Sequence, residues 1–352
     1  MSVFEHHEFD QHEKVLFCKD KSSGLQAIIA VHNTNLGPAL GGCRMWHYAD
    51  SSEALTDVLR LSKGMTYKAA MANLKLGGGK AVIIGNPHTD KTPAMMTAMG
   101  RFVNAAQGDY ITAEDSGISI DDLNLMSEQS QYVAGIHSRY SFHGGHADGN
   151  PAPATAYGVF VGLKESVRYK LGTDLKGLKV AIQGLGHVGY RLAQQLKDEG
   201  AELIVTDIYE QQLKRAEAEL GAIVVSPEEI VQQDVDVFAP CALGAVLNER
   251  TIPQLKCKVI AGAANNQLAK EEHGKLLVEA GILYAPDYVL NAGGIIDICH
   301  QNQEDSSAQA LKTHLEGIAL TLREIYTRAD QEQLPTNRVS NLIAEERFGK
   351  SW

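Results

Sequence analysis

The chain has 352 residues, of which 44% are hydrophobic and 21% are charged, which predicts a globular protein with enough apolar residues for two cores. A net charge of −11 disfavours nucleic acid and anionic membranes as partners. The sequence contains no run of about 18 apolar residues and no signal-peptide pattern at its start, so we expect no membrane span and no export. The five cysteines include no CxxC pair, which is typical of reduced thiols and predicts a cytoplasmic protein.

The first 136 residues are expected to alternate between strands and helices. An amphipathic start ends at a turn formed by residues 22–24. The elements expected after this turn are a strand over 25–32, a glycine-rich loop over 33–44, a helix over 52–74, a strand starting at Lys80, a helix from Thr92 and Pro93 to about 106, a strand over 110–112 and a helix from about 121.

Residues 137–153 are rich in glycine and proline and predict a loop at a domain boundary. Helices and strands then alternate to about Tyr288, which predicts a parallel, doubly wound sheet. A long helix is expected over 306–328, and a short helix after Pro335 should end at Phe348 and pack back on the first domain. The predicted fold is therefore α/β, with a catalytic and oligomerisation domain over 1–140, joined by 330–352, and a Rossmann-type domain over 150–329.

The segment over 178–207 has the pattern of a strand, a glycine turn, a helix and a second strand. Gly184 permits the tight turn, Gly186 lets a pyrophosphate approach the backbone, and Gly189 lets the helix pack closely on the strand. Asp207 lies at the end of the second strand, where an acid can bind the adenosine ribose and repel the 2′-phosphate of NADP. The pattern predicts binding of NAD, with three intervening residues also near the cofactor: Leu185, His187 and Val188.

Two lysines, Lys68 and Lys80, lie close to glycines, and Asp115 lies at a predicted strand end. Together they suit a substrate that carries a carboxylate and an amine, because one ammonium can hold the carboxylate and the other can act as a base. The alternative is two surface lysines and a helix-capping aspartate, and the residue pattern alone leaves both open. The string GGGK is not a phosphate-binding P-loop, because Leu74 replaces the required first glycine.

Thirteen histidines raise the question of a metal site, and His143 and His146 lie close together in the loop over 137–150. No cysteine or glutamate there completes a ligand set, so we expect solvated histidines and no metal. The sequence assigns no role to this loop.

Seven motifs in chain order carry a resemblance that covers essentially the whole chain: PALGGCR, GMTYKAA, GGGKAVI, ITAEDSG, APCALG, AGAANNQL and YAPDYVLNAGG. In them the chain resembles the glutamate/leucine/phenylalanine/valine dehydrogenase family, and among its members most nearly the leucine-specific ones. The resemblance implies NAD-dependent oxidative deamination of an L-amino acid to a 2-oxo acid and ammonia, in a cleft between two domains.

The resemblance also implies residue roles. Lys80 would activate water, Asp115 would handle the amine proton, and Lys68 with Asn266 would bind the substrate carboxylate. The other substrate residues implied are Leu40, Gly41, Gly42, Met65, Ala113, Ile295 and Ile298. Beyond the glycine turn, the implied cofactor residues are Thr155, Cys241, Ala242, Leu243, Asn265 and Asn291. As a base Lys80 needs a lowered pKa, and a shift from ~10.4 to ~8 costs about 3 kcal/mol.

The substrate side chain is predicted to be apolar. Glutamate-specific members carry a lysine where this chain has Leu40, and a buried carboxylate without a partner is costly. Leucine, valine and isoleucine are favoured, and an aromatic substrate such as phenylalanine or tryptophan is the alternative. Two rivals are a non-catalytic NAD-binding sensor, which need not retain Lys68, Lys80 and Asp115, and a hydroxy-acid dehydrogenase, which would use a histidine base.

Some features depart from the leucine dehydrogenase pattern. Cys43, His187 and Asp297 replace residues common in those enzymes, and the loop after residue 137 is longer than usual. The chain ends at Trp352, soon after its last predicted helix, whereas octameric members carry a longer tail. The sequence therefore favours a homodimer over an octamer and leaves the physiological direction of the reaction open.

Overall fold

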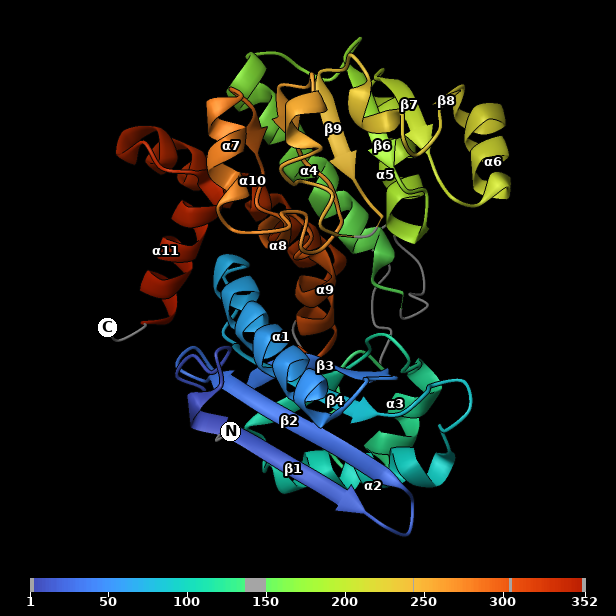
Figure 1. The fold of residues 1–352 in the computed structure, drawn as a ribbon, viewed down its shortest axis with the longest axis vertical. Coiled ribbons are helices and arrows are strands. Elements are labelled where there is room, and N and C mark those ends of the chain that lie inside the picture. The colour runs from blue at the N-terminus through green and yellow to red at the C-terminus, as the bar shows by residue number, and fades with distance from the viewer. Residues whose placement is uncertain (1–2, 137–149, 243, 304–305, 350–352) are drawn as a thin grey trace. The chain divides into compact units, whose positions relative to one another are not determined.

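The computed structural model describes residues 3–136, 150–242, 244–303 and 306–349. The chain divides into two compact units, of which unit 1 comprises Met1–Gly149, Ile298–Ser306 and Ala344–Trp352, and unit 2 comprises Asn150–Asp297 and Ser307–Ile343 (Figure 1). This division differs from the predicted boundary at 330, because only the last turns of the final helix join unit 1. Most of the predicted boundary loop lies outside the described residues.

Unit 1 is built on a mixed sheet with the strand order β1-β2-β4-β3-β5. The strands are β1 (Lys14–Asp20), β2 (Leu25–Asn33), β3 (Ala39–Trp46), β4 (Gly77–Ile84) and β5 (Tyr110–Ala113). β2 pairs antiparallel with β1 and β4, whereas β3 runs parallel to β4 and to β5. The carboxyl ends of β3, β4 and β5 therefore lie at one edge of the sheet.

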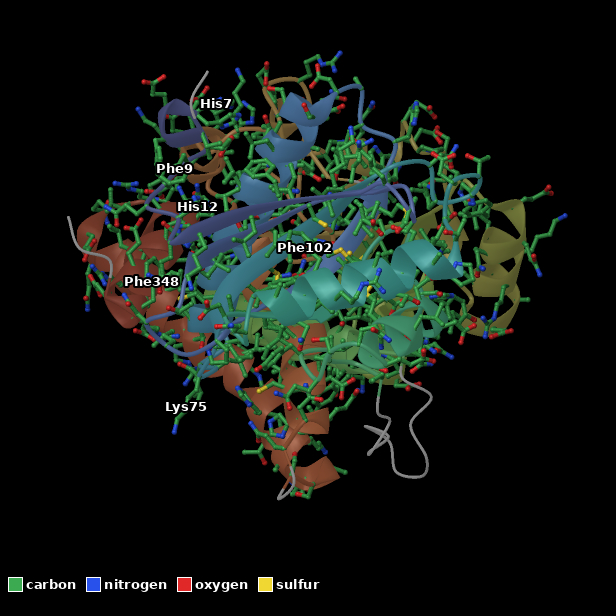
Figure 2. All side chains as sticks on the ribbon, turned by 90° about the horizontal axis from the view of Figure 1, so that it is seen from below. His7, Phe9, His12, Lys75, Phe102 and Phe348 are labelled. Carbon is green, nitrogen blue, oxygen red and sulfur yellow. The ribbon has the colours of Figure 1, made fainter. Side chains whose placement is uncertain are left out.

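Helices cover both faces of this sheet (Figure 1). They are α1 (Ser51–Met71), α2 (Pro93–Ala105) and α3 (Ile120–Ser127). Alternate residues of β2 point into two cores, with Ile28 in the core under α1 and Ile29 in the core under α2 and α3. Phe102 on α2, labelled in Figure 2, packs at the margin of the second core. The predicted start of α2 is confirmed, because the Thr92 hydroxyl accepts from the Met95 amide and Pro93 occupies the first helical turn.

Three predictions for unit 1 were wrong. β1 was missed, the expected loop over 33–44 contains β3, and β4 begins at Gly77 rather than at Lys80. Glycine is a poor strand former, but here the glycines of β3 and β4 face each other. A methyl group on Gly41 would overlap the Gly79 carbonyl oxygen, so the two strands can lie this close only without side chains.

Unit 2 is built on a parallel sheet with the order β11-β10-β9-β6-β7-β8. Its strands are β6 (Lys179–Gln183), β7 (Glu202–Thr206), β8 (Ile223–Val224), β9 (Val237–Pro240), β10 (Val259–Ile260) and β11 (Leu283–Tyr284). Numbered within the unit, the order is 3-2-1-4-5-6, the doubly wound arrangement of dinucleotide-binding domains. The predicted α/β class and doubly wound sheet are confirmed.

The helices of the second half of the chain are α4 (Ala152–Leu171), α5 (His187–Asp198), α6 (Glu210–Leu220), α7 (His273–Glu279), α8 (Asp287–Leu290), α9 (Gly293–Gln301), α10 (Ala308–Glu332) and α11 (Thr336–Phe348). α10, the predicted long helix, packs along α4 through Ile318 and Leu322, which lie against the glycines of α4. Within the described residues, no helix is long and apolar enough to cross a membrane.

Candidate functional site

A buried ion pair lies on the α1 face of the unit 1 sheet. Lys80 lies within β4, opposite Ala30 of β2, and is 5% exposed. Asp115 follows β5, and its Oδ2 accepts a hydrogen bond from the Lys80 ammonium. The side chains of the two residues are 6% and 17% exposed, so this charge pair is largely removed from water. The structure therefore joins the two residues that the sequence proposed as catalytic, although 35 positions separate them.

Asp115 is held in its ionised form. Burial alone would raise its pKa, but the positive charges of Lys80 and Arg44 outweigh burial and lower the pKa to about 2. The neighbouring Glu114 shows the opposite balance, because burial and the negative charge of Asp115 raise its pKa. The site therefore presents a permanent carboxylate at neutral pH, next to a primary amine.

The double glycine of β3 makes room for this pair. A methyl group at Gly42 would lie 2.8 Å from Cβ of Asp115 and 2.6 Å from the Glu114 carbonyl oxygen. The carbonyl oxygen of Gly41 accepts a hydrogen bond of 2.7 Å from the buried Tyr110 hydroxyl. Gly41 and Gly42 are thus fixed beside Asp115 by backbone packing.

The other predicted substrate residues are divided between the two units. In unit 1, Leu40 and Ala113 are 3% exposed and apolar, while Lys68 and Met65 lie half-buried on α1. Ile298 also belongs to unit 1, and a methyl group added at Gly135 would meet it at 3.7 Å. Asn266 and Ile295 belong to unit 2, the first exposed with a positive φ of 52° and the second buried.

Sequence reasoning missed Arg44. Its Nη2 lies 3.5 Å from Oδ1 of Asp115, and its Nη1 donates to Oδ2 of Asp57 at 2.9 Å. The arginine belongs to the motif PALGGCR, and alternation along a strand would have placed it on the same face as Gly42. The signal was lost because this segment was predicted to be a loop.

The predicted cofactor turn in unit 2 has the geometry that its glycines require. Gly184 has a φ of +101°, and a methyl group there would lie 2.8 Å from Cβ of Ala242. A methyl group on Gly189 would overlap the Gly184 carbonyl oxygen. Gly186 is different, because a methyl group there would meet no atom of the described residues within 4 Å. Its exposed backbone leaves room for a pyrophosphate at the start of α5, where no side chain caps the helix.

Asp207 lies at the end of β7 and braces this turn. Its Oδ2 accepts from the Leu185 amide at 2.5 Å, and its Oδ1 accepts from the Tyr209 amide at 2.9 Å. β6 and β9 are neighbours at the point where the strand order reverses, and the Cys241 amide donates to the Gln183 carbonyl oxygen at 2.7 Å. Ligands of doubly wound folds bind at this switch point.

The remaining predicted cofactor residues lie in the same unit. Asn291 Nδ2 donates to Oδ1 of Asn265 at 2.7 Å, while among the described residues the buried Oδ1 of Asn291 has no hydrogen-bond partner. Thr155 lies in the first turn of α4, where its hydroxyl donates to the Pro151 carbonyl oxygen. His187 and Val188 begin α5, with His187 exposed. Leu243 lies outside the described residues.

The described residues contain no group of three or more histidine, cysteine, aspartate or glutamate side chains placed to hold a metal ion. His143 and His146 lie outside the described part of the chain.

A doubly wound unit with an open glycine turn, together with a second unit that carries a buried lysine–aspartate pair, defines a two-domain enzyme of the dehydrogenase type. The family described as Glu/Leu/Phe/Val dehydrogenase, dimerisation domain, matches residues 12–132, and Glutamate/Leucine/Phenylalanine/Valine dehydrogenase matches residues 144–208 and 203–345. The chain belongs to this family, whose members use a nicotinamide cofactor. The resemblance found in the sequence is confirmed.

The chain is similar to leucine dehydrogenases over nearly its full length. It is 49% identical to that of Geobacillus stearothermophilus and 48% identical to that of Thermoactinomyces intermedius, over 99% of this chain and 94% of each relative. A crystal structure of L-tryptophan dehydrogenase from Nostoc punctiforme is 43% identical, with a TM-score of 0.85 and coverage of 96% of both chains.

Proposed function

We propose that the protein catalyses the NAD-dependent, reversible oxidative deamination of an apolar L-amino acid to its 2-oxo acid and ammonia. Leucine, valine and isoleucine are the favoured substrates. The observation that carries this proposal is the buried pair of Lys80 and Asp115 beside the double glycine of β3, in a chain 48–49% identical to leucine dehydrogenases.

The residues of unit 1 provide proton transfer. When bound, NAD would accept the hydride from the substrate α-carbon. Lys80 removes a proton from the water that attacks the resulting iminium of the substrate, for which its amine must first be neutral. Asp115 handles the amine proton of the substrate, and between transfers its carboxylate accepts a hydrogen bond from Lys80. Lys68 binds the substrate carboxylate. For Asn266, which belongs to unit 2, we propose the same role on the family resemblance alone.

The residues of unit 2 fit a dinucleotide. The open position at Gly186 and the uncapped start of α5 suit the pyrophosphate. Asn291 Oδ1, which has no partner in the described part of the chain, offers an acceptor to a polar group of the cofactor. Asp207 suits an adenosine ribose with a free 2′-hydroxyl and repels a 2′-phosphate, so we propose NAD rather than NADP.

The substrate class follows from the apolar residues of the site. Leu40 and Ala113 are buried, and Met65, Ile295 and Ile298 are apolar as well. The side-chain carboxylate of a glutamate substrate would therefore have no partner among them. An aromatic substrate is the second candidate, which the similarity to the tryptophan dehydrogenase structure favours. A non-catalytic NAD-binding sensor is the candidate of another class.

We propose further that the protein is a cytoplasmic homodimer. Its described cysteines are free thiols, as in reducing compartments. β1 is an edge strand with Phe17 59% exposed, and the family match over residues 12–132 is described as a dimerisation domain. Sedimentation equilibrium should give twice the chain mass of 38.1 kDa, and a mass near eight chains would exclude the dimer.

The test of the function is NADH formation at about pH 10, where the α-amine of the substrate is largely neutral, with a panel of L-amino acids. Leucine, valine, isoleucine, phenylalanine, tryptophan and glutamate are each tried with NAD and with NADP. We expect turnover of several aliphatic substrates with NAD, because a methylene group changes selectivity by only ~1–3 kcal/mol. Preference for tryptophan would favour the aromatic candidate, preference for glutamate would contradict the apolar pocket, and no turnover with any substrate would favour the sensor.

A further inference from the structure

The carboxylate of Asp115 has two separate sets of partners. Oδ2 accepts from the Lys80 ammonium. Oδ1 accepts from the Ser116 amide at 2.5 Å and faces Nη2 of Arg44 at 3.5 Å. Arg44 therefore contacts Oδ1, the carboxylate oxygen that does not accept from Lys80.

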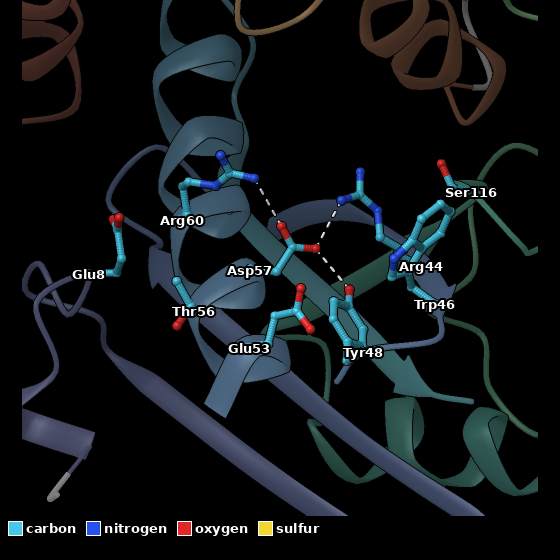
Figure 3. A pocket seen from close by; sticks show the side chains of 9 residues that line it. All are labelled: Glu8, Arg44, Trp46, Tyr48, Glu53, Thr56, Asp57, Arg60 and Ser116. Carbon is cyan, nitrogen blue, oxygen red and sulfur yellow. Dashed lines mark hydrogen bonds and ion pairs between the residues drawn. The ribbon is translucent and has the colours of Figure 1, made fainter. Parts of the chain in front are cut away.

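Arg44 is itself anchored on the side away from Asp115. Figure 3 shows its guanidinium directed toward Asp57 of α1, whose Oδ2 also accepts from the Tyr48 hydroxyl at 2.8 Å. The side chains of Arg44 and Asp57 are 24% and 13% exposed. Nε of Arg44 is buried and finds no hydrogen-bond partner among the described residues, so the two carboxylates dictate how the guanidinium lies. A planar guanidinium presents its two Nη groups in a fixed fork, which suits two carboxylates at fixed positions.

We propose that Arg44 is a positioning residue that keeps Asp115 ionised and correctly oriented while Lys80 exchanges its proton. This inference rests on the proposed function, in which Lys80 must be neutral for part of each turnover. During that part, Asp115 loses the charge of its nearer partner. A guanidinium cannot lose its proton in a protein, so Arg44 remains a cation throughout the cycle.

The residues around Arg44 make the inference testable by chemical rescue. Arg44 and Ser116 line a cleft of about 470 Å³, shared with Asp57 and Arg60 (Figure 3). Removal of the Arg44 side chain leaves the half-buried carboxylates of Asp57 and Asp115 without this cation, at a cleft that Asp57 lines and that free guanidinium can enter. Arg60 supplies a matched control, because it also donates to Asp57, at 3.1 Å, but its side chain is 53% exposed and, among the ion pairs of the described residues, it forms none with Asp115.

The experiment measures kcat and KM for Arg44→Ala and Arg60→Ala with the best substrate of the wild-type panel. We expect Arg44→Ala to lose about 100-fold in kcat, with KM within about threefold, because misplacing a catalytic group mainly affects the chemical step. Millimolar guanidinium should raise the kcat of Arg44→Ala at least about tenfold, whereas urea, which is uncharged, should leave that kcat unchanged. Arg60→Ala should keep wild-type kcat and ignore guanidinium.

Two results would overturn the inference while the proposed function stands. One is a folded Arg44→Ala protein with wild-type kcat, and the other is a loss of kcat that urea and guanidinium affect equally. If Arg44→Ala does not fold, Arg44→Lys is compared with Arg44→Gln. The charged variant should keep at least about tenfold more kcat than the neutral one, and equal kcat values would overturn the inference. A wild-type protein that turns over no amino acid would instead contradict the proposed function.

Discussion

The two candidate sites use opposite means to bind and act on ligands. In unit 1 the site consists of side chains that pack together largely away from water, in which Asp115 contacts both Lys80 and Arg44. In unit 2 the site consists of backbone, and its central feature is the open position at Gly186. Substitutions in unit 1 should therefore act through charge and proton transfer, whereas substitutions in unit 2 should act through shape.

The largest effect is expected at Lys80. Lys80→Ala should lower kcat by about 1,000-fold or more, because a positioned acid–base group contributes 10²–10⁴. NADH binding, measured by fluorescence titration, should remain within about threefold of wild type, since the implied cofactor residues lie in unit 2. An unchanged kcat would show that Lys80 takes no part in the chemistry, and would contradict the expectation that substitutions in unit 1 act through proton transfer.

A smaller effect is expected on stability at Asp115. Its pKa in the folded protein, about 2, lies below the ordinary 3.8, so the ionised form stabilises the fold. This contribution is fully present above about pH 4 and is lost as the pH falls through about 2. Asp115→Asn should therefore lower the free energy of unfolding at neutral pH by about 2 kcal/mol, as measured by urea denaturation.

The difference in the free energy of unfolding between wild type and Asp115→Asn should become smaller as the pH falls below about 4. Asp174→Asn is the control, because its ion pair with Arg168 is exposed on both sides and should contribute less than about 1 kcal/mol. If wild type and Asp115→Asn had equal free energies of unfolding at neutral pH, or if their difference grew in acid, the account of the electrostatics at Asp115 would be contradicted.

The smallest effect is expected at Gly186. Gly186→Ala should leave the melting temperature nearly unchanged, because a methyl group there meets none of the described atoms within 4 Å. It should nonetheless weaken NADH binding by about tenfold or more, because the methyl group occupies the approach of the pyrophosphate. Gly317→Ala is a matched control, since a methyl group on this glycine of α10 also has no neighbour within 4 Å among the residues that the structure describes. Equal Kd values for the two variants would argue against a phosphate site at the glycine turn.

The sequence predicted unit 2 better than unit 1 because the signals of unit 2 are local. The glycine turn, its helix and Asp207 fall within 30 consecutive residues, so spacing alone predicted strand, helix and strand in the right places. The final helix was also predicted with the right bounds: Pro335 marks its start, and it was expected to end at Phe348, as it does.

Unit 1 was harder to predict because its site depends on contacts between distant segments. Glycine propensity favoured a loop at Gly41 and Gly42, and only the facing strand β4 explains why a glycine strand forms there. The contact between Arg44 and Asp115 spans 71 positions and depends on the order β4-β3-β5, which no local pattern predicts. The two lysines were singled out because glycines lie next to them in the sequence, but their roles rested on family resemblance and remain proposals.

The central claim is that the buried pair of Lys80 and Asp115 serves amine chemistry, and the most direct test is the ammonium dependence of the reverse reaction. NADH oxidation is followed with 4-methyl-2-oxopentanoate, the 2-oxo acid of leucine, in buffers with and without ammonium. The account predicts a rate that rises with ammonium to saturation and is absent without it. A rate that is independent of ammonium would mean that the 2-oxo acid is reduced to a hydroxy acid, and would contradict the account.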